Sequence, residues 1–331
     1  MTTALASAET TGPFAFSGER PSARAERRLP EQPWFETPDL ERRLHDSGAD
    51  DATRAFAREL AENGLARIDL GDEGRALCEA VRTEVEPVFE DPQVQRVQDA
   101  WLRSETVRRL ATLPAIVERL SLAYGRRAFP FQTLNFKRGT QQDLHSDAMH
   151  FHTDPPLFMA GVWIALEDIR PDSGPLTYVP GSHRLPVLTM RGAGVDSAHP
   201  TRDDYNRAYT PALKAQIEAA GLKPAEVTPK AGEAVVWAAN LAHGGAPIAN
   251  PDATRRSLVV HFYFEGCVYY TPMYSDVEGG RLAVRLPANV ATGGWVWPRR
   301  GARPAAPEFT AFLGACRKLL LRQPIVTRSQ A

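Results

Sequence analysis

Two residues in the segment LHSD, His145 and Asp147, are separated by a single residue. On a β-strand, side chains two positions apart point to the same face, so an imidazole nitrogen and a carboxylate oxygen can reach one metal ion. His243 comes much later, at the end of the apolar run ANLA, and two glycines follow it that let other atoms approach closely. Two histidines and one carboxylate are the facial ligand set of non-haem iron(II) sites, which leaves adjacent coordination positions open for a cosubstrate and dioxygen.

A pair of arginines follows this histidine. Arg255 and Arg256 stand at the start of the apolar run SLVVHFYF. A guanidinium at this place can hold a carboxylate in bidentate fashion, as the far end of a 2-oxoacid cosubstrate would require. Because strand side chains alternate, one of the two arginines can face the barrel interior; if it is Arg255, then Ser257 and His261 share its face.

The elements that must position these residues are short. The chain has 331 residues, 43% of them hydrophobic, which is enough for a large core. After Gly125 it consists of β-like runs separated by Gly, Pro and Asp, a pattern typical of an antiparallel sandwich or barrel. The expected strands are 131–137, 159–169, 174–182, 233–242 and 256–266.

The remaining segments complete the expected organisation. Residues 1–30 lack periodicity and are expected to be a flexible arm before a single domain, 31–331. Within that domain, 50–125 has helical periodicity with one strand at 65–70, and 126–298 is expected to form the barrel. The stretch 185–225 is long enough to be a substrate loop, and 299–331 is a basic segment expected to be solvated.

Taken together, the motifs resemble the phytanoyl-CoA dioxygenase family of iron(II)- and 2-oxoglutarate-dependent oxygenases. The resemblance covers roughly residues 128 to 266. It rests on LHSD, GVWIALEDI, DSGPLTYVPGSHR, the HGG at 243–245 and RRSLVVHFY. It implies a mainly β fold with flanking helices, a double-stranded β-helix (a cupin-like jelly roll), in which the 50–125 helices pack on the outer face.

The resemblance also implies roles for individual residues. The metal ligands would be His145, Asp147 and His243, and Arg255 would bind the distal carboxylate of 2-oxoglutarate, or Arg256 if the alignment slips by one position. Asn135 would lie close to the cosubstrate, with Gln132 facing a substrate. The implied cofactors are Fe(II), 2-oxoglutarate and O2. The implied reaction is hydroxylation of an unactivated C–H bond in a small molecule, for example in natural-product biosynthesis, with release of succinate and CO2.

Several histidines and tryptophans leave alternatives. His152 and Asp154 form a second His-x-Asp pair, but it runs directly into two prolines, so the first pair is favoured as the metal site. His150 and His152 are then groups near the metal or the substrate, or polar loop residues. His261 either lines the pocket or is a hydrogen-bonded core residue, with the core favoured. His183 is expected to cap a turn, and Trp163 and Trp237 are expected to be ordinary core residues.

Other activities are weighed against the same residues. Asp147 disfavours halogenation, which needs a small residue at that position. Desaturation, ring closure or epimerisation would use the same ligands as hydroxylation. A metal-binding jelly roll without oxygenase activity is a different class of protein, and it does not require Arg255.

Composition excludes several kinds of partner. With 39 basic and 40 acidic residues the net charge is -1, which argues against a nucleic-acid ligand. The three cysteines lack CxxC spacing, and no apolar run is long enough for a membrane span or a signal peptide. A cytoplasmic monomer or homodimer acting on a small-molecule substrate is expected.

Overall fold

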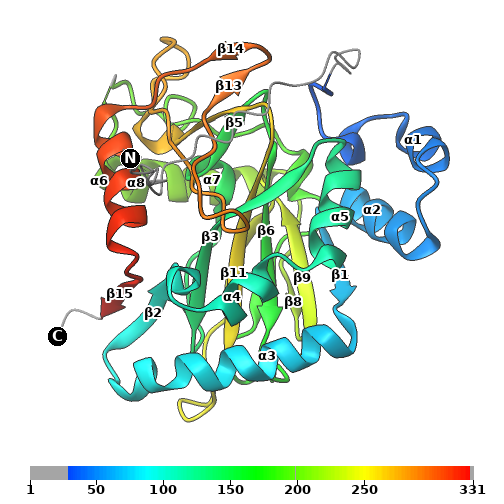
Figure 1. Ribbon diagram of the computed structural model, residues 1–331. Coiled ribbons are helices and arrows are strands. Elements are labelled where there is room, and N and C mark those ends of the chain that lie inside the picture. The colour runs from blue at the N-terminus through cyan, green and yellow to red at the C-terminus, as the bar shows by residue number, and fades with distance from the viewer. Residues whose placement is uncertain (1–28, 198, 329–331) are drawn as a thin grey trace, which may run out of the picture.

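The computed structural model describes residues 29–197 and 199–328, so most of the expected N-terminal arm lies outside the described residues. Its centre is a seven-stranded antiparallel sheet in the order β1-β9-β6-β11-β3-β2-β15 (Figure 1). In that order the strands are β1 (Leu65–Asp69), β9 (Glu233–Ala238), β6 (Met159–Ala165), β11 (Ser257–Phe264), β3 (Ala128–Phe136), β2 (Val94–Gln98) and β15 (Ile325–Arg328).

A four-stranded sheet carries the HGG motif. Its order is β4 (His145–Ser146), β10 (Ala242–Gly245), β7 (Leu176–Tyr178) and β8 (Ala225–Val227). The run 233–242, expected as one strand, is divided between the two sheets: β9 ends at Ala238 and β10 begins at Ala242. Strands that pass from one sheet to the other are typical of a jelly roll, and this feature could not be read from the continuous apolar pattern. Two small two-stranded sheets pair β5 (His152–Asp154) with β12 (Val268–Tyr270) and β13 (Arg299–Arg300) with β14 (Arg303–Pro304).

Helices cover one face of the large sheet. They are α2 (Asp51–Asn63), α3 (Gly71–Val85), α4 (Glu105–Ala111) and α5 (Pro114–Tyr124), and in Figure 1 α3 and α4 cross in front of the strands while α1 (Leu40–Asp46) lies beside α2, away from the sheet. Ser104 caps α4, since its side chain accepts a hydrogen bond from the backbone N–H of Val107. Tyr124 of α5 stacks on Phe264 of β11 at 3.9 Å and donates a hydrogen bond to the Met159 carbonyl. The helices therefore hold the strands that carry the site.

Strand β11 separates an outer face from an inner one. Leu258, Val260 and Phe262 are fully buried in the core cluster that includes the helices. The alternate residues point inward, and the inner position His261 pairs with Gln132 on β3. This register decides which polar side chains of β3 and β11 can reach the interior.

Two segments contain more structure than their composition suggests. The insertion forms α6 (Arg202–Asp204), a π-helical turn (Tyr205–Tyr209) and α7 (Thr210–Ala219). The basic C-terminal segment is not simply a solvated surface. It forms α8 (Phe309–Leu321) and then β15, which pairs with β2 at the edge of the large sheet. No helix among the described residues is long and apolar enough to cross a membrane.

Candidate metal centre

Strands β4 and β10 bring two histidines together. His145 and His243 are directly opposed across the two strands, and their ring centroids are 4.4 Å apart. Asp147 follows β4 in a 3-10 turn, Asp147–Met149, and its Oδ2 lies 3.8 Å from Nε2 of His243. One ligand atom from each of the three buried residues falls within 4.8 Å of the others. The structure thus brings together the three residues that the sequence selects as metal ligands.

Hydrogen bonds orient both imidazoles. Nδ1 of His145 lies 3.0 Å from the Asp143 carbonyl oxygen, and Nδ1 of His243 lies 2.9 Å from the Leu241 carbonyl oxygen. A carbonyl oxygen can only accept, so each Nδ1 carries the proton and each Nε2 keeps its lone pair for a metal. Burial lowers the pKa of His243 to about 4, which keeps that ring neutral.

The carboxylate is ionised although it is buried. Burial by itself raises the pKa of Asp147, but the imidazoles of His243, His261 and His145 and the indole N–H of Trp237 outweigh it and bring the pKa to about 2. Two neutral imidazoles and one carboxylate are the donor set that suits a divalent metal of the iron type.

Trp237 is more than an ordinary core residue. It is 2% exposed, as expected, but its Nε1 donates a 2.8 Å hydrogen bond to Oδ2 of Asp147 and its ring lies 4.6 Å from that of His243. The ring needs a glycine opposite it, because a Cβ at Gly161 would lie 2.1 Å from the indole. Sequence reasoning missed this contact because it depends on the pairing of β6 with β9.

The glycines after His243 allow a close approach of backbone. A Cβ on Gly244 would lie 2.6 Å from the carbonyl oxygen of Gln142, and one on Gly245 would lie 2.9 Å from the amide nitrogen of Gln141. The segment they admit leads directly into Asp143, whose carbonyl orients His145. Side chains at these two positions would displace this segment, and with it the Asp143 carbonyl that orients His145.

His261 lines the centre, contrary to the preference for a core role. Its Nε2 lies 3.7 Å from Oδ2 of Asp147, and its Nδ1 lies 2.9 Å from Oε1 of Gln132. Gln132 therefore faces the interior beside the centre.

The two arginines point to opposite faces. Arg255 is 4% exposed; it donates one hydrogen bond, to the Gly174 carbonyl, and its guanidinium carbon lies 5.1 Å from the Trp163 ring centroid. Its Nε has no hydrogen-bond partner, and neither has the buried hydroxyl of Ser257, two residues further on the same face. Burial lowers the pKa of Arg255 to about 10, so it remains charged at neutral pH. Trp163, also expected as core, thus forms the floor under this guanidinium.

Arg256 is fully engaged on the outer face. It forms ion pairs with Glu86 at 2.7 Å and with Glu167 at 3.0 Å. Both carboxylates would compete with any added anion for Arg256. Arg255 is therefore the arginine whose N–H donors are more available to an anion. Ser257 shares the face of Arg255, as the alternation in the sequence predicts.

The placement of Asn135 beside the cosubstrate is wrong. Asn135 pairs with Leu258, which points into the helix-covered core, whereas Gln132 pairs with the inward-facing His261. Residues three apart on a regular strand take opposite faces, so Gln132 and Asn135 cannot both face the interior. The β-bulge in this pairing lies between His261 and Phe262, outside the interval that would have to change.

The second His-x-Asp pair lies elsewhere. His152 belongs to β5, where it pairs with Tyr270 of β12, and Asp154 is held by Arg300. His150 stays closer to the centre, with its ring centroid 6.1 Å from that of His145 and 5.1 Å from that of Tyr205 in the insertion. His183 holds a turn in place, with Nε2 3.2 Å from the Ala61 carbonyl oxygen.

Comparison with known proteins agrees with this geometry. The family model of the phytanoyl-CoA dioxygenases (PhyH) matches residues 49–257, more than half of the chain. The chain belongs to the phytanoyl-CoA dioxygenase family. The family and the class of enzyme expected from the sequence, 2-oxoglutarate-dependent oxygenases, are thereby confirmed.

Individual known proteins resemble this family member only in part of their length or at low sequence identity. Over 82 residues it is 33% identical to phytanoyl-CoA dioxygenase domain-containing protein 1 of Bos taurus, a match that spans 22% of this chain and 28% of that protein. The crystal structure of the epimerase SnoN in complex with Fe3+, alpha ketoglutarate and nogalamycin RO is 22% identical with a TM-score of 0.50, over 66% of this chain and 86% of SnoN.

Two further solved structures share the fold. The carbocyclase SnoK from nogalamycin biosynthesis is 18% identical over 71% of this chain and 90% of SnoK, with a TM-score of 0.54. EctD from S. alaskensis with 2-oxoglutarate and 5-hydroxyectoine is 15% identical over 76% of this chain and 89% of EctD, with a TM-score of 0.52. The jelly-roll fold class is confirmed.

Removing the carboxylate ligand should abolish tight metal binding. We expect Asp147→Ala to weaken iron(II) binding, measured by anaerobic titration, by more than the roughly 10–100-fold that loss of an outer hydrogen bond costs. Asp154→Ala is the matched control and should leave the affinity within about threefold, because Asp154 contacts Arg300 rather than the centre. Comparable losses in the two variants would refute the choice of the first His-x-Asp pair.

The indole hydrogen bond should matter separately from the indole ring. Trp237→Phe keeps most of the ring but removes the donor to Asp147, so we expect iron(II) affinity to fall by about 10–100-fold. Trp163→Phe is the matched control, since Nε1 of Trp163 has no hydrogen-bond partner to lose. If both variants bound iron(II) as the unaltered protein does, the hydrogen bond would have no part in holding the ligand.

Proposed function

We propose that this protein is an iron(II)- and 2-oxoglutarate-dependent dioxygenase that hydroxylates an unactivated C–H bond of a small molecule, with release of succinate and CO2. The observation that carries the proposal is the combination of a three-donor centre with a buried guanidinium that has no acidic partner among the described residues. Natural-product biosynthesis is the proposed setting, supported by the origin of two of its fold relatives in nogalamycin biosynthesis.

The centre suits iron(II). His145 and His243 would supply Nε2 and Asp147 a carboxylate oxygen, and positions on the metal would remain open because no fourth protein donor belongs to the group among the described residues. When bound, iron(II) and 2-oxoglutarate supply the oxidising chemistry that dioxygen alone does not perform. The protein's own contribution is to hold the ligands, to orient the substrate and to exclude water.

Arg255 would bind the distal carboxylate of 2-oxoglutarate. A guanidinium buried to this degree loses hydration, and a single hydrogen bond to a carbonyl leaves most of its N–H donors unused. A carboxylate would satisfy both the charge and the donors, and the unpartnered hydroxyl of Ser257 lies on the same face to add a further donor. Trp163 would fix the plane of the guanidinium from below.

A metal-binding jelly roll without oxygenase activity explains less. Such a protein would account for His145, Asp147 and His243, but it gives no reason to bury the charge of Arg255 without a partner. Burying an unpaired charge is costly, so the position is best explained by an anionic cosubstrate.

Succinate formation tests the proposal directly. Purified protein supplied with iron(II), ascorbate and 2-oxoglutarate should release succinate, and a chelator or Asp147→Ala should abolish this release. Incubation with a library of small molecules should identify one whose product gains the mass of one oxygen atom. Loss of two hydrogens would indicate desaturation or ring closure, an unchanged mass would indicate epimerisation, and no succinate under any condition would overturn the proposal.

The two arginines should differ in their effect on the cosubstrate. Loss of a bidentate, partly desolvated contact typically costs about 2–5 kcal/mol, so Arg255→Ala should raise the 2-oxoglutarate requirement by at least about tenfold. Arg256→Ala, the matched control on the outer face, should change it by less than about fivefold. The measurement is succinate release against 2-oxoglutarate concentration. Reversed effects would mean that β11 is one residue out of register; no effect from either would remove the cosubstrate assignment.

A further inference from the structure

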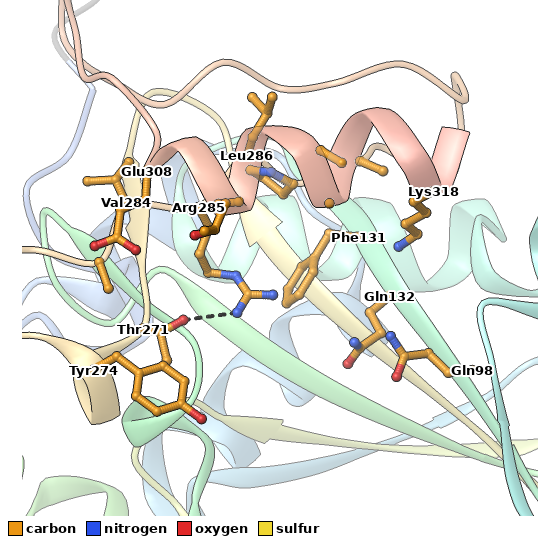
Figure 2. Close-up of a pocket in the computed structure, with 17 residues that line it drawn as sticks. Gln98, Phe131, Gln132, Thr271, Tyr274, Val284, Arg285, Leu286, Glu308 and Lys318 are labelled. Atoms are coloured by element: carbon orange, nitrogen blue, oxygen red, sulfur yellow. Dashed lines mark hydrogen bonds between the residues drawn. The ribbon is translucent and has the colours of Figure 1, made fainter. Parts of the chain in front are cut away.

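A second pocket lies beside the metal centre, under the C-terminal helix. Its volume is about 420 Å³, which falls within the range of small-molecule sites. Residues from β2, β3, the segment 283–288 and α8 line it, and Gln132 is among them. Figure 2 shows the side chain of Arg285 reaching into this pocket between Phe131 and Thr271.

The pocket adjoins the metal centre through shared side chains. Gln132 on its wall lies 2.9 Å from Nδ1 of His261, whose Nε2 lies 3.7 Å from Asp147. From the other side, the guanidinium carbon of Arg285 lies 4.9 Å from the ring of Phe151, and that ring lies 4.9 Å from the ring of His261. A molecule in the pocket can therefore contact the wall of the centre while its other end is held by Arg285.

Arg285 carries the uncompensated charge of this pocket. Of the charged residues that line it, Lys318 is paired with Asp99 at 2.7 Å and Glu308 with Arg281 at 3.7 Å. Arg285 donates one hydrogen bond, to Thr271 at 3.0 Å, and its buried Nε has no partner. No carboxylate among the described residues forms an ion pair with it.

Neighbouring cations add to the positive charge that Arg285 brings to the pocket. Arg96 stands on β2 two residues before Gln98, on the face that lines the pocket, and its Nε donates a long hydrogen bond, at 3.4 Å, to Oγ1 of Thr327. Burial, and then the positive charge of Arg202 in the insertion, lower the pKa of Arg96. These arginines make the approach to the centre attractive to an anion.

We propose that the substrate is a small organic anion, a carboxylate or a phosphate ester, whose charged group is bound by Arg285. This inference rests on the proposed oxygenase function, since it names the class of molecule that the metal centre would oxidise. The charged group would lie under α8, and the rest of the molecule would extend from there toward Gln132, on the side of the pocket nearest the centre.

The sequence of α8 leaves room for this molecule. Three of the residues that it contributes to the lining are small, Ala311, Gly314 and Ala315, and among the described residues a Cβ at Gly314 would meet no atom within 4 Å. The helix therefore covers the pocket without filling it. A larger residue at Gly314 can fill the pocket without altering Arg285.

A pair of dyes tests the anion site on the whole protein. We would titrate 8-anilinonaphthalene-1-sulfonate, and N-phenyl-1-naphthylamine as the same ring system without the sulfonate, into protein holding iron(II) and 2-oxoglutarate under nitrogen. The sulfonate dye should bind more tightly, and Arg285→Gln should weaken it by at least about tenfold while changing the neutral dye by less than about twofold. Arg285→Lys, which keeps the charge, should retain most of the preference.

Matched variants locate the dye. Gly314→Leu should weaken both dyes by filling the pocket, and Arg299→Gln, at an exposed arginine of β13, should change neither. Benzoate or phenyl phosphate should displace the sulfonate dye, and neutral benzamide should not; the stronger competitor identifies a carboxylate or a phosphate. Any of four results would overturn the inference. In the unaltered protein these are equal binding of the two dyes or no binding of the sulfonate dye. In the variants they are undiminished binding of the sulfonate dye by Arg285→Gln or unchanged dye affinity in Gly314→Leu.

The two proposals can fail separately. Dye binding under nitrogen requires no turnover, whereas succinate release by the unaltered protein requires no substrate anion. Anion-selective binding without succinate release would support the anion site and overturn the oxygenase function. Succinate release without anion-selective binding would support the oxygenase function and overturn the anion site.

Discussion

The opposition of His145 and His243 across β4 and β10 is the constraint on which the centre depends. These strands are short, so their register is set by the turn between β9 and β10 rather than by a long ladder. Asn240 in that turn donates to the Leu185 carbonyl at 2.8 Å and accepts from the Ser146 hydroxyl at 3.3 Å, which ties the turn to β4 and to the insertion. A slip of one residue would turn His243 to the other face and separate the ligands.

Local spacing predicted the parts of the site that lie close together in the chain. Alternation next to β11 gives the opposite orientations of Arg255 and Arg256, and the His-x-Asp spacing selects His145 with Asp147, although Asp147 itself lies in the 3-10 turn after β4. The same rule places Gln132 and Asn135 on opposite faces of β3, so the family resemblance, which implies that both lie near the centre, conflicts with alternation at Asn135. The roles of Trp237 and His261 and the pairing of β15 with β2 arise between segments far apart in the chain, and no local pattern carries that information.

The arginines of the protein show how charge is distributed around the interior. On the outer face Arg256 is satisfied by Glu86 and Glu167, and such pairs need no ligand to explain them. On the inner side Arg255 and Arg285 each donate one hydrogen bond to a neutral oxygen and keep an unpartnered Nε. Arg255 is buried and Arg285 is half-buried, and neutral acceptors compensate such cations only in part, so both places favour an anion that comes from outside the chain.

Helix α8 differs from the helices on the outer face in what it buries. Phe264 and Tyr124 show how α5 anchors to β11 through large aromatic rings, whereas α8 turns alanines and a glycine toward the sheet and leaves Phe309 and Leu320 73% and 71% exposed. A helix arranged in this way adds little to the core, and its position depends on β15 and on the Lys318–Asp99 ion pair. Contacts hold α8 at both ends, because Lys318 pairs with Asp99 while Glu308, at the start of the helix, donates its backbone N–H to the Val284 carbonyl and pairs with Arg281. The space beneath the middle of the helix can therefore stay open, and the C-terminal segment acts to shape the pocket rather than to stabilise the barrel.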